Sequence, residues 1–177
     1  MQEILDASQV RDALDRLHEA VVKQLPDDDR LAVVGIRTRG ETLAQRIVRR
    51  LREDQPERTI ELGVLDVTFY RDDFSRRRRL PLVRATEIDF DLDDTWLLLV
   101  DDVLQTGRSI RAALDAIHDF GRPRVIRLAV LVDRGGRELP ISADLVGQTV
   151  QAEPDQRVQV CLEENDGREG VYVFARS

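Results

Sequence analysis

The sequence has little that would cross-link the chain or anchor it in a membrane. Its 177 residues include one cysteine, Cys161, which excludes a disulfide framework and a cysteine-based metal site. No apolar run approaches the ~20 residues that a membrane-spanning helix needs. The first residues lack the basic start and apolar core of a signal peptide. We therefore expect a single domain with a cytoplasmic location and no membrane partner.

Lysine is almost absent as well. One of the 27 basic residues is a lysine, Lys23, so 26 are arginines, and 34 acidic residues bring the net charge to −7. A net negative charge argues against nucleic-acid binding over the whole surface. Arginine suits planar, bidentate recognition of phosphate better than lysine does. The composition is therefore compatible with a local basic patch that binds an anion.

Short apolar runs alternate with amphipathic stretches along the chain. The apolar runs predict strands at 31–36, 60–70, 96–100 and 125–132, with shorter strands at 145–150, 157–162 and 170–174. Apolar residues at helical spacing predict helices at 6–25, 43–51 and 110–120. This alternation indicates an α/β fold with a parallel sheet. The stretch 71–94, which holds the run Arg76–Arg79, has no periodicity and predicts a long flexible loop.

Two carboxylates and a hydroxyl-rich turn follow the predicted strand at 96–100. Asp101 and Asp102 come first, then Thr106, Gly107 and Ser109 lead into a helix. Helix N-terminal amides favour an anion, and the carboxylates suit the hydroxyls of a sugar. Together they describe a site for a ribose 5-phosphate. Ordinary helix capping is the alternative that these residues alone leave open.

Five segments carry a family resemblance. Residues 97–109 read LLLVDDVLQTGRS and resemble the PRPP-binding motif of type I phosphoribosyltransferases. Residues 34–40 (VGIRTRG), 63–73 (GVLDVTFYRDD), 121–123 (GRP) and 128–144 (LAVLVDRGGRELPISAD) together resemble the PyrR family. These proteins are uracil phosphoribosyltransferases, many of which double as RNA-binding attenuators of pyrimidine operons. The match runs in order from the first helix to about Val150.

The resemblance implies the type I phosphoribosyltransferase fold, in which helices flank a central, mostly parallel sheet. It also implies a single domain over 1–177, with a small hood at about 134–150 and a flexible loop at about 71–94. A homo-oligomer, as a dimer or larger assembly, is expected from the same resemblance.

The implied reaction converts uracil and PRPP to UMP and pyrophosphate with Mg²⁺. Magnesium would be held mainly by PRPP and water, with Asp101 or Asp102 as a further ligand, so no separate protein metal site is expected. The catalytic residues would be Asp101, Asp102 and Arg71, and the uracil-binding residues Val132, Arg134 and Arg137. PRPP and its phosphates would be bound by two loops, through Thr38, Arg39, Gly40, Val103, Leu104, Gln105, Thr106, Gly107, Arg108 and Ser109. Gln105 departs from the family, which usually has tyrosine there.

A UMP-responsive, RNA-binding regulator of pyrimidine operons is the alternative function. The family binds RNA through basic and hydroxyl side chains on the first helix and after the fourth strand. Here Asp12 and Asp15 stand on that helix, and Gly136 and Ser142 replace residues that are often basic. Residues 1–30 hold four basic and eight acidic residues. We therefore expect RNA attenuation to be weak or lost. Transfer to a purine or to orotate is a third possibility, which the match at 128–144 disfavours.

Overall fold

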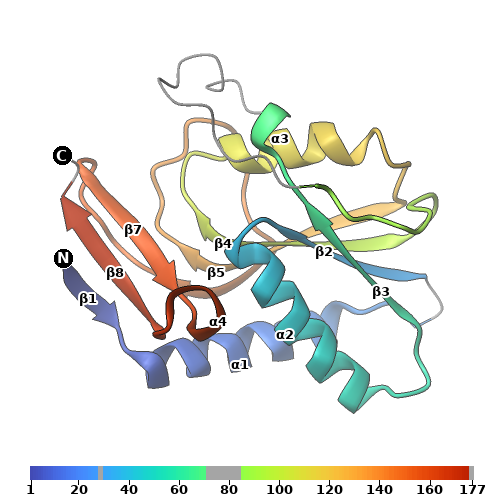
Figure 1. Cartoon of the computed structure of the whole chain (residues 1–177), viewed down its shortest axis with the longest axis horizontal. Coiled ribbons are helices and arrows are strands. Elements are labelled where there is room, and N and C mark those ends of the chain that lie inside the picture. The colour runs from blue at the N-terminus through green and yellow to red at the C-terminus, as the bar shows by residue number, and fades with distance from the viewer. Residues whose placement is uncertain (28–29, 71–84, 176–177) are drawn as a thin grey trace.

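The structure is a computed structural model that describes residues 1–27, 30–70 and 85–175 (Figure 1). The elements in chain order are β1 (Gln2–Leu5), α1 (Ala7–Gln24), β2 (Leu31–Ile36), α2 (Arg39–Asp54), β3 (Ile60–Leu65), the 3₁₀ turn η1 (Thr68–Tyr70), β4 (Trp96–Leu104), α3 (Arg108–Ile117), β5 (Val125–Asp133), β6 (Leu145–Thr149), β7 (Gln156–Cys161), α4 (Glu163–Asp166) and β8 (Gly170–Ala175).

A five-stranded parallel sheet in the order β3-β2-β4-β5-β6 forms the centre of the molecule (Figure 1). Helices cover both of its faces, so β2 is apolar and buried along its whole length. Val33 of β2 packs in the core shared with α1 and α2, and its neighbour Val34 packs in the core shared with α3. This arrangement confirms the α/β class and the parallel sheet expected from the sequence.

The first helix forms for the reasons its sequence suggests. Asp6 and Gln9 make a reciprocal capping box, in which each backbone amide donates to the other's side chain at 2.9 Å. Buried residues follow at helical spacing: Val10, Ala13, Leu17, His18 and Val21. No helix in the described ranges is long and apolar enough to cross a membrane.

The strand predicted at 60–70 is too long. β3 ends at Leu65 because the Asp66 side chain accepts hydrogen bonds from the backbone amide and hydroxyl of Thr68 and turns the chain into η1. The predicted loop at 71–94 is also only partly a loop. Glu87 pairs with Val64 in an antiparallel bridge, and Leu92 is fully buried. Residues 71–84 lie outside the described ranges.

The expected hood segment, 134–150, is placed differently. Within it, β6 joins the main sheet beside β5. A separate antiparallel sheet, β1-β8-β7, is formed instead by the two ends of the chain, and α4 lies in the turn between β7 and β8 (Figure 1). The sequence prediction missed β1 and α4, since both are only four residues long.

Candidate active site

The two predicted carboxylates lie inside β4, which is longer than the sequence suggested. β4 runs on to Leu104 because Asp101, Val103 and Leu104 pair with the end of β5. The Asp101 carboxylate accepts a hydrogen bond from the Asp102 amide, and the Asp102 carboxylate accepts one from the Val103 amide, each at 2.9 Å. These short backbone contacts hold both carboxylates at the carboxyl end of the sheet, where ligands of parallel sheets bind.

Burial acts against the charge of Asp102. Burial raises the pKa of Asp102, while a side-chain hydrogen bond with Asp101 and the positive charge of Arg39 act in the opposite direction. Asp101 is itself buried, with 7% of its surface exposed. Hydrogen-bond donors or a cation beside the Asp102 carboxyl group would therefore favour its ionised form.

The loop after β4 turns sharply into α3. Gly107 adopts a left-handed conformation, with φ of 89°, that suits glycine. The Thr106 carbonyl accepts hydrogen bonds from the amides of Glu138 and Leu139, and the Thr106 hydroxyl accepts one from the Arg108 amide. The turn is thereby fixed on both sides, and the first amides of α3 lie at its end. Such amides have no partner within the helix and suit a phosphate.

The loop after β2 packs directly on β4. Gly35 and Gly40 allow this approach: a Cβ on Gly40 would lie 2.5 Å from the Val100 carbonyl oxygen, and one on Gly35 would lie 2.4 Å from the Gly40 carbonyl oxygen. The Arg37–Thr38 peptide bond, at the start of this turn, is cis. The structure therefore brings the two predicted phosphate loops together at Asp101.

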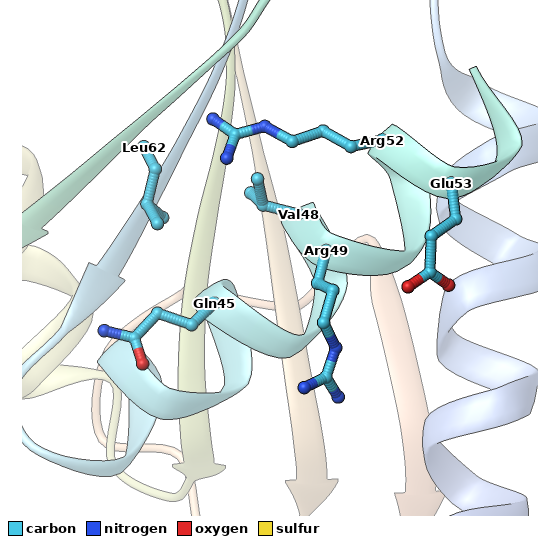
Figure 2. A pocket seen from close by; sticks show the side chains of 6 residues that line it. All are labelled: Gln45, Val48, Arg49, Arg52, Glu53 and Leu62. Atoms are coloured by element: carbon cyan, nitrogen blue, oxygen red, sulfur yellow. The ribbon is translucent and has the colours of Figure 1, made fainter. Parts of the chain in front are cut away.

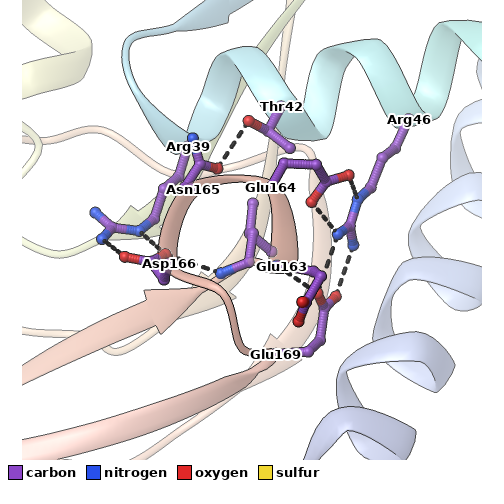
Figure 3. Close-up of polar contacts among 9 residues, drawn as sticks. Arg39, Thr42, Arg46, Glu163, Glu164, Asn165, Asp166 and Glu169 are labelled. Atoms are coloured by element: carbon purple, nitrogen blue, oxygen red, sulfur yellow. Dashed lines mark hydrogen bonds and ion pairs between the residues drawn. The ribbon is translucent and has the colours of Figure 1, made fainter.

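The two arginines of this loop have different partners. The Arg37 guanidinium donates to the Ala85 carbonyl, Glu41 and Glu87, so it ties the loop to the segment that returns to the sheet. Arg39 donates from Nε and Nη2 to Asp166 of α4, at 3.0 and 2.6 Å (Figure 3). Asp166 is a site neighbour that the sequence prediction missed, because 127 residues separate it from Arg39.

A cleft of about 720 Å³ lies beyond the carboxyl ends of β5 and β6. It is lined by Asp133, Arg134, Gly135, Arg137, Thr149, Val150, Gln151, Ala152, Glu153 and Gln156. The Arg137 guanidinium donates to the Gln105 carbonyl at 3.0 Å, which joins the cleft to the loop after β4. The cleft therefore adjoins the loop after β4 and includes Arg134 and Arg137, two of the residues that the sequence predicts to bind the base.

The three residues predicted to bind uracil differ in their position relative to the cleft. Val132 is fully buried in the core and does not line the cleft. Arg134 is also buried, and it donates to the backbone carbonyls of Gln156, Glu153 and Ala152, at 2.9, 3.3 and 3.4 Å. It therefore holds the far wall of the cleft against β5.

Arg137 builds the near side of the cleft. It donates to the Ile141 carbonyl at 2.8 Å and to the Asp133 carboxylate at 2.5 Å. Burial opposes ionisation of Asp133, but the hydrogen bonds from Arg137 and the Gly135 amide together hold its pKa below the ordinary value. The sequence prediction missed Asp133 as the partner of Arg137, although the two are four residues apart.

A second hollow, of about 350 Å³, lies between α2 and β3, away from these loops (Figure 2). Its lining residues are Gln45, Val48, Arg49, Arg52, Glu53 and Leu62. The Arg52 guanidinium donates to the Ile60 carbonyl at the start of β3. None of these residues contacts the carboxyl edge described above. Arg71 and the run 76–79, predicted to meet phosphate, lie outside the described residues.

Comparisons with known proteins agree on the family. The model of the phosphoribosyl transferase domain matches residues 1–165. The chain is 46% identical over 172 residues to a protein of Pelotomaculum thermopropionicum called bifunctional protein PyrR, covering 97% of this chain and 94% of that one. It is 49% identical over 174 residues to the protein of the same name from Thermus thermophilus, covering 98% and 96%.

Solved structures share the fold at lower identity. A hypoxanthine phosphoribosyltransferase of Staphylococcus aureus aligns with a TM-score of 0.70 at 16% identity, covering 96% of this chain and 89% of that one. A purine phosphoribosyltransferase of Pyrococcus horikoshii aligns with a TM-score of 0.61 at 24% identity, covering 81% and 84%. At these identities the likeness concerns the fold alone.

Proposed function

Because the chain belongs to the phosphoribosyl transferase domain family, and within it to the PyrR family, we propose that it converts uracil and PRPP to UMP and pyrophosphate. The observation that carries this proposal is the meeting of two loops, where Gly40 packs against β4 at Asp101. A diphosphate on the first loop would stand beside ribose hydroxyls held by Asp101 and Asp102. PRPP carries these groups on neighbouring carbons of one sugar.

The reaction would be a displacement at the anomeric carbon of the ribose. A ring nitrogen of uracil forms a bond to that carbon and loses its proton, while pyrophosphate leaves with the electron pair of the broken bond. As positive charge develops on the ribose, Asp101 and Asp102 would stabilise it through the ribose hydroxyls. Arg39 would stabilise the leaving pyrophosphate, and Arg71 would add to this from the segment outside the described residues.

The turn at 105–109 would bind the 5-phosphate. The first amides of α3 and the hydroxyls of Thr106 and Ser109 would donate to it, and Gly107 permits close approach of the backbone. Leu104 is buried in the core, so its contribution would be limited to its backbone. The Arg108 side chain is paired with Glu138 at 2.8 Å, and its backbone amide, which donates to the Thr106 hydroxyl at 3.3 Å, would turn to the phosphate on binding.

Magnesium fits the donors at this edge. Mg²⁺ prefers phosphate oxygens, water and one or two carboxylates, and Asp101 and Asp102 are the carboxylates at this end of β4. When bound, the ion would neutralise charge on the pyrophosphate. In the described part of the chain, no group of three or more His, Cys, Asp or Glu side chains is arranged to hold a metal by itself.

Uracil would occupy the cleft beyond β5 and β6. Its carbonyl and amide groups suit reading by the backbone of the cleft wall, because Arg134 and Arg137 donate to neighbouring protein groups. The two arginines would then shape the cleft and add positive charge to it. The choice of uracil rests on the PyrR relatives, which are far closer in sequence than the purine enzymes that share the fold.

RNA binding is the second candidate function, favoured by the word bifunctional in the relatives' names. We propose that it is weak in this chain. The exposed charged residues of α1 are Arg11, Asp12, Arg16, Glu19 and Lys23, and half-buried Asp15 pairs with Arg50 at 2.7 Å. Acids on this surface would repel phosphates. Sub-micromolar gel-shift binding to a pyrimidine-operon leader, competed poorly by unrelated RNA, would contradict the proposal.

Assembly and location follow from the family in the same way. We propose a cytoplasmic homo-oligomer, and the single cysteine, which is buried and unpaired, is compatible with a reducing compartment. Multi-angle light scattering of the purified chain tests the assembly. A mass equal to that of one chain at all concentrations would contradict it.

A base panel tests the main proposal. The chain is mixed with PRPP, Mg²⁺ and one of uracil, hypoxanthine, guanine or orotate, and nucleotide and pyrophosphate are both quantified. We expect UMP and pyrophosphate in equal amounts with uracil, and little turnover of the other bases. Turnover of hypoxanthine or orotate without turnover of uracil would overturn the substrate assignment and leave the fold assignment intact.

A further inference from the structure

A short turn far along the chain is attached to the pyrophosphate loop. α4 is four residues long, too short to be stable by itself, and one face of α2 holds it (Figure 3). Thr42 donates to Asn165 at 2.8 Å, and Arg46 pairs with both Glu164 and Glu169. Arg39, one turn earlier on α2, pairs with Asp166. The turn thus ends directly beside the first residue of α2.

The contact between Arg39 and Asp166 is the most specific of the set. Both oxygens of Asp166 accept from the guanidinium, in a bidentate arrangement with fixed relative orientation. The Leu162 amide donates to the same carboxylate at 3.0 Å, so Asp166 is held from a second side. The hydrogen bond from Arg39 lowers the pKa of Asp166, so the carboxylate stays ionised at neutral pH. Arg39 is thus held by a rigid, charged partner.

The edge of Arg39 that carries Nη1 has no part in the contact with Asp166. Nε and Nη2 serve Asp166, so the edge that carries Nη1 faces away from that carboxylate. The charge of Arg39 acts on Asp102, and Gly40, the next residue, packs against Asp101. A pyrophosphate group between this loop and the ribose carboxylates would meet the Nη1 edge.

We propose that Asp166 is a positioning residue for phosphoribosyl transfer, which holds Arg39 in the orientation that receives the pyrophosphate of PRPP. This inference rests on the proposed function. Asp166 does not touch the substrate; it acts through the bidentate contact and through its second anchor at Leu162. In the opposite role, Asp166 would compete with pyrophosphate for Arg39. The two roles predict opposite changes in affinity when the carboxylate is removed.

The test compares Asp166→Asn with Glu164→Gln. Both variants neutralise one carboxylate of α4 that forms a bidentate pair with an arginine of α2, and only Asp166 faces the site. We expect Asp166→Asn to raise the KM for PRPP and weaken binding of magnesium pyrophosphate by about tenfold each, with the KM for uracil unchanged. Glu164→Gln should leave all three unchanged. Calorimetry and initial-rate kinetics supply these values.

Three outcomes would overturn the inference: unchanged PRPP affinity in Asp166→Asn, tighter PRPP affinity in it, or equal losses in both variants. If Asp166→Asn does not fold, Asp166→Glu keeps the charge and displaces it by one methylene group. It should also raise the KM for PRPP, and an unchanged value would overturn the inference.

Failure of this inference is distinct from failure of the proposed function. Binding of magnesium pyrophosphate needs no base. If no base is turned over but pyrophosphate binds and depends on Asp166, the proposed reaction is wrong and the positioning role stands. If uracil is turned over and neither variant changes PRPP affinity, the reaction stands and the positioning role is wrong.

Discussion

The phosphate end and the base end of the site are built in different ways. At the phosphate end, consecutive residues 101–109 form a strand end, a turn and a helix start, and backbone contacts between neighbours fix the carboxylates. At the base end, Arg134 and Arg137 join segments that lie 18 to 32 residues apart in the sequence. The two carboxylates of the phosphate end are therefore held by local contacts, and the base end depends on long-range contacts. A substitution at the phosphate end should change the rate of the reaction, and a substitution at the base end should change the shape of the cleft.

The largest expected effect is on the chemistry of the phosphate end. The double variant Asp101→Asn with Asp102→Asn removes the negative charge near the ribose but keeps the side-chain shapes. We expect kcat to fall about 100- to 1,000-fold, as when a group that stabilises transition-state charge is removed. The thermal unfolding midpoint should change little, since burial already opposes the charge of Asp102. Asp115→Asn, on the exposed side of α3, is the control, and unchanged kinetics in the double variant would remove the two residues from this role.

A comparison of two glycines sharpens the contrast. Gly40→Ala would place a Cβ 2.5 Å from the Val100 carbonyl, so the loop must move away from β4. We expect a loss of about 1–3 kcal/mol in the free energy of unfolding. With that shift we expect more than about tenfold lower kcat/KM for PRPP. At the base end, a Cβ on Gly135 would meet open space and only the left-handed conformation opposes it, at a cost of about 1 kcal/mol. Urea unfolding and kinetics of both variants test this, and equal activity losses would contradict it.

A smaller effect is expected from Arg134→Met at the base end. The change leaves the carbonyls of Ala152, Glu153 and Gln156 without this donor, which should cost about 1–3 kcal/mol of unfolding free energy. The KM for uracil should rise severalfold while the KM for PRPP stays constant, because only the cleft wall loosens. Arg127→Met removes an exposed pair with Asp144 and should cost less than about 1 kcal/mol. A rise in the KM for PRPP alone would break the distinction between the two ends.

The smallest effect concerns acid stability of the contact between α2 and α4. Hydrogen bonds from Arg39 and Arg46 lower the pKa values of Asp166 and Glu164. Their stabilisation is therefore complete above the ordinary carboxyl pKa of about 4 and is lost as the pH falls through the lower folded values. The double variant Asp166→Asn with Glu164→Gln should lose less thermal stability between pH 6 and pH 3 than the parent chain. If the melting temperatures of the parent chain and the double variant fall equally between pH 6 and pH 3, the assignment is contradicted.

The same contrast explains what could be predicted from the sequence. β2 was predicted with its bounds, and the turn into α3 was placed correctly, whereas β4 runs four residues past the predicted strand and includes Asp101 and Asp102. β3 was predicted too long because the apolar pattern continues past Asp66, whose side chain ends the strand. The pairing of β1 with β8 and of Arg39 with Asp166 joins opposite ends of the chain. Such contacts arise from tertiary packing, and local sequence patterns do not reveal them.

The role of the arginines shows the same limit. Arg134 and Arg137 were predicted to donate to the base because their charges and position fit that task. In the structure their donors hold carbonyls and Asp133 around the cleft. A side-chain type predicts which groups it can bind, but the competing acceptors that reach it are known only once the fold is known.

A crystal structure with UMP tests the central claim most directly. We predict the phosphate on the amides at 106–109, the ribose hydroxyls on Asp101 and Asp102, and the uracil ring in the cleft between β5 and residues 150–156. We also predict that Arg134 keeps its three backbone partners in that complex. UMP bound elsewhere on the molecule, or with its phosphate away from the start of α3, would contradict the account.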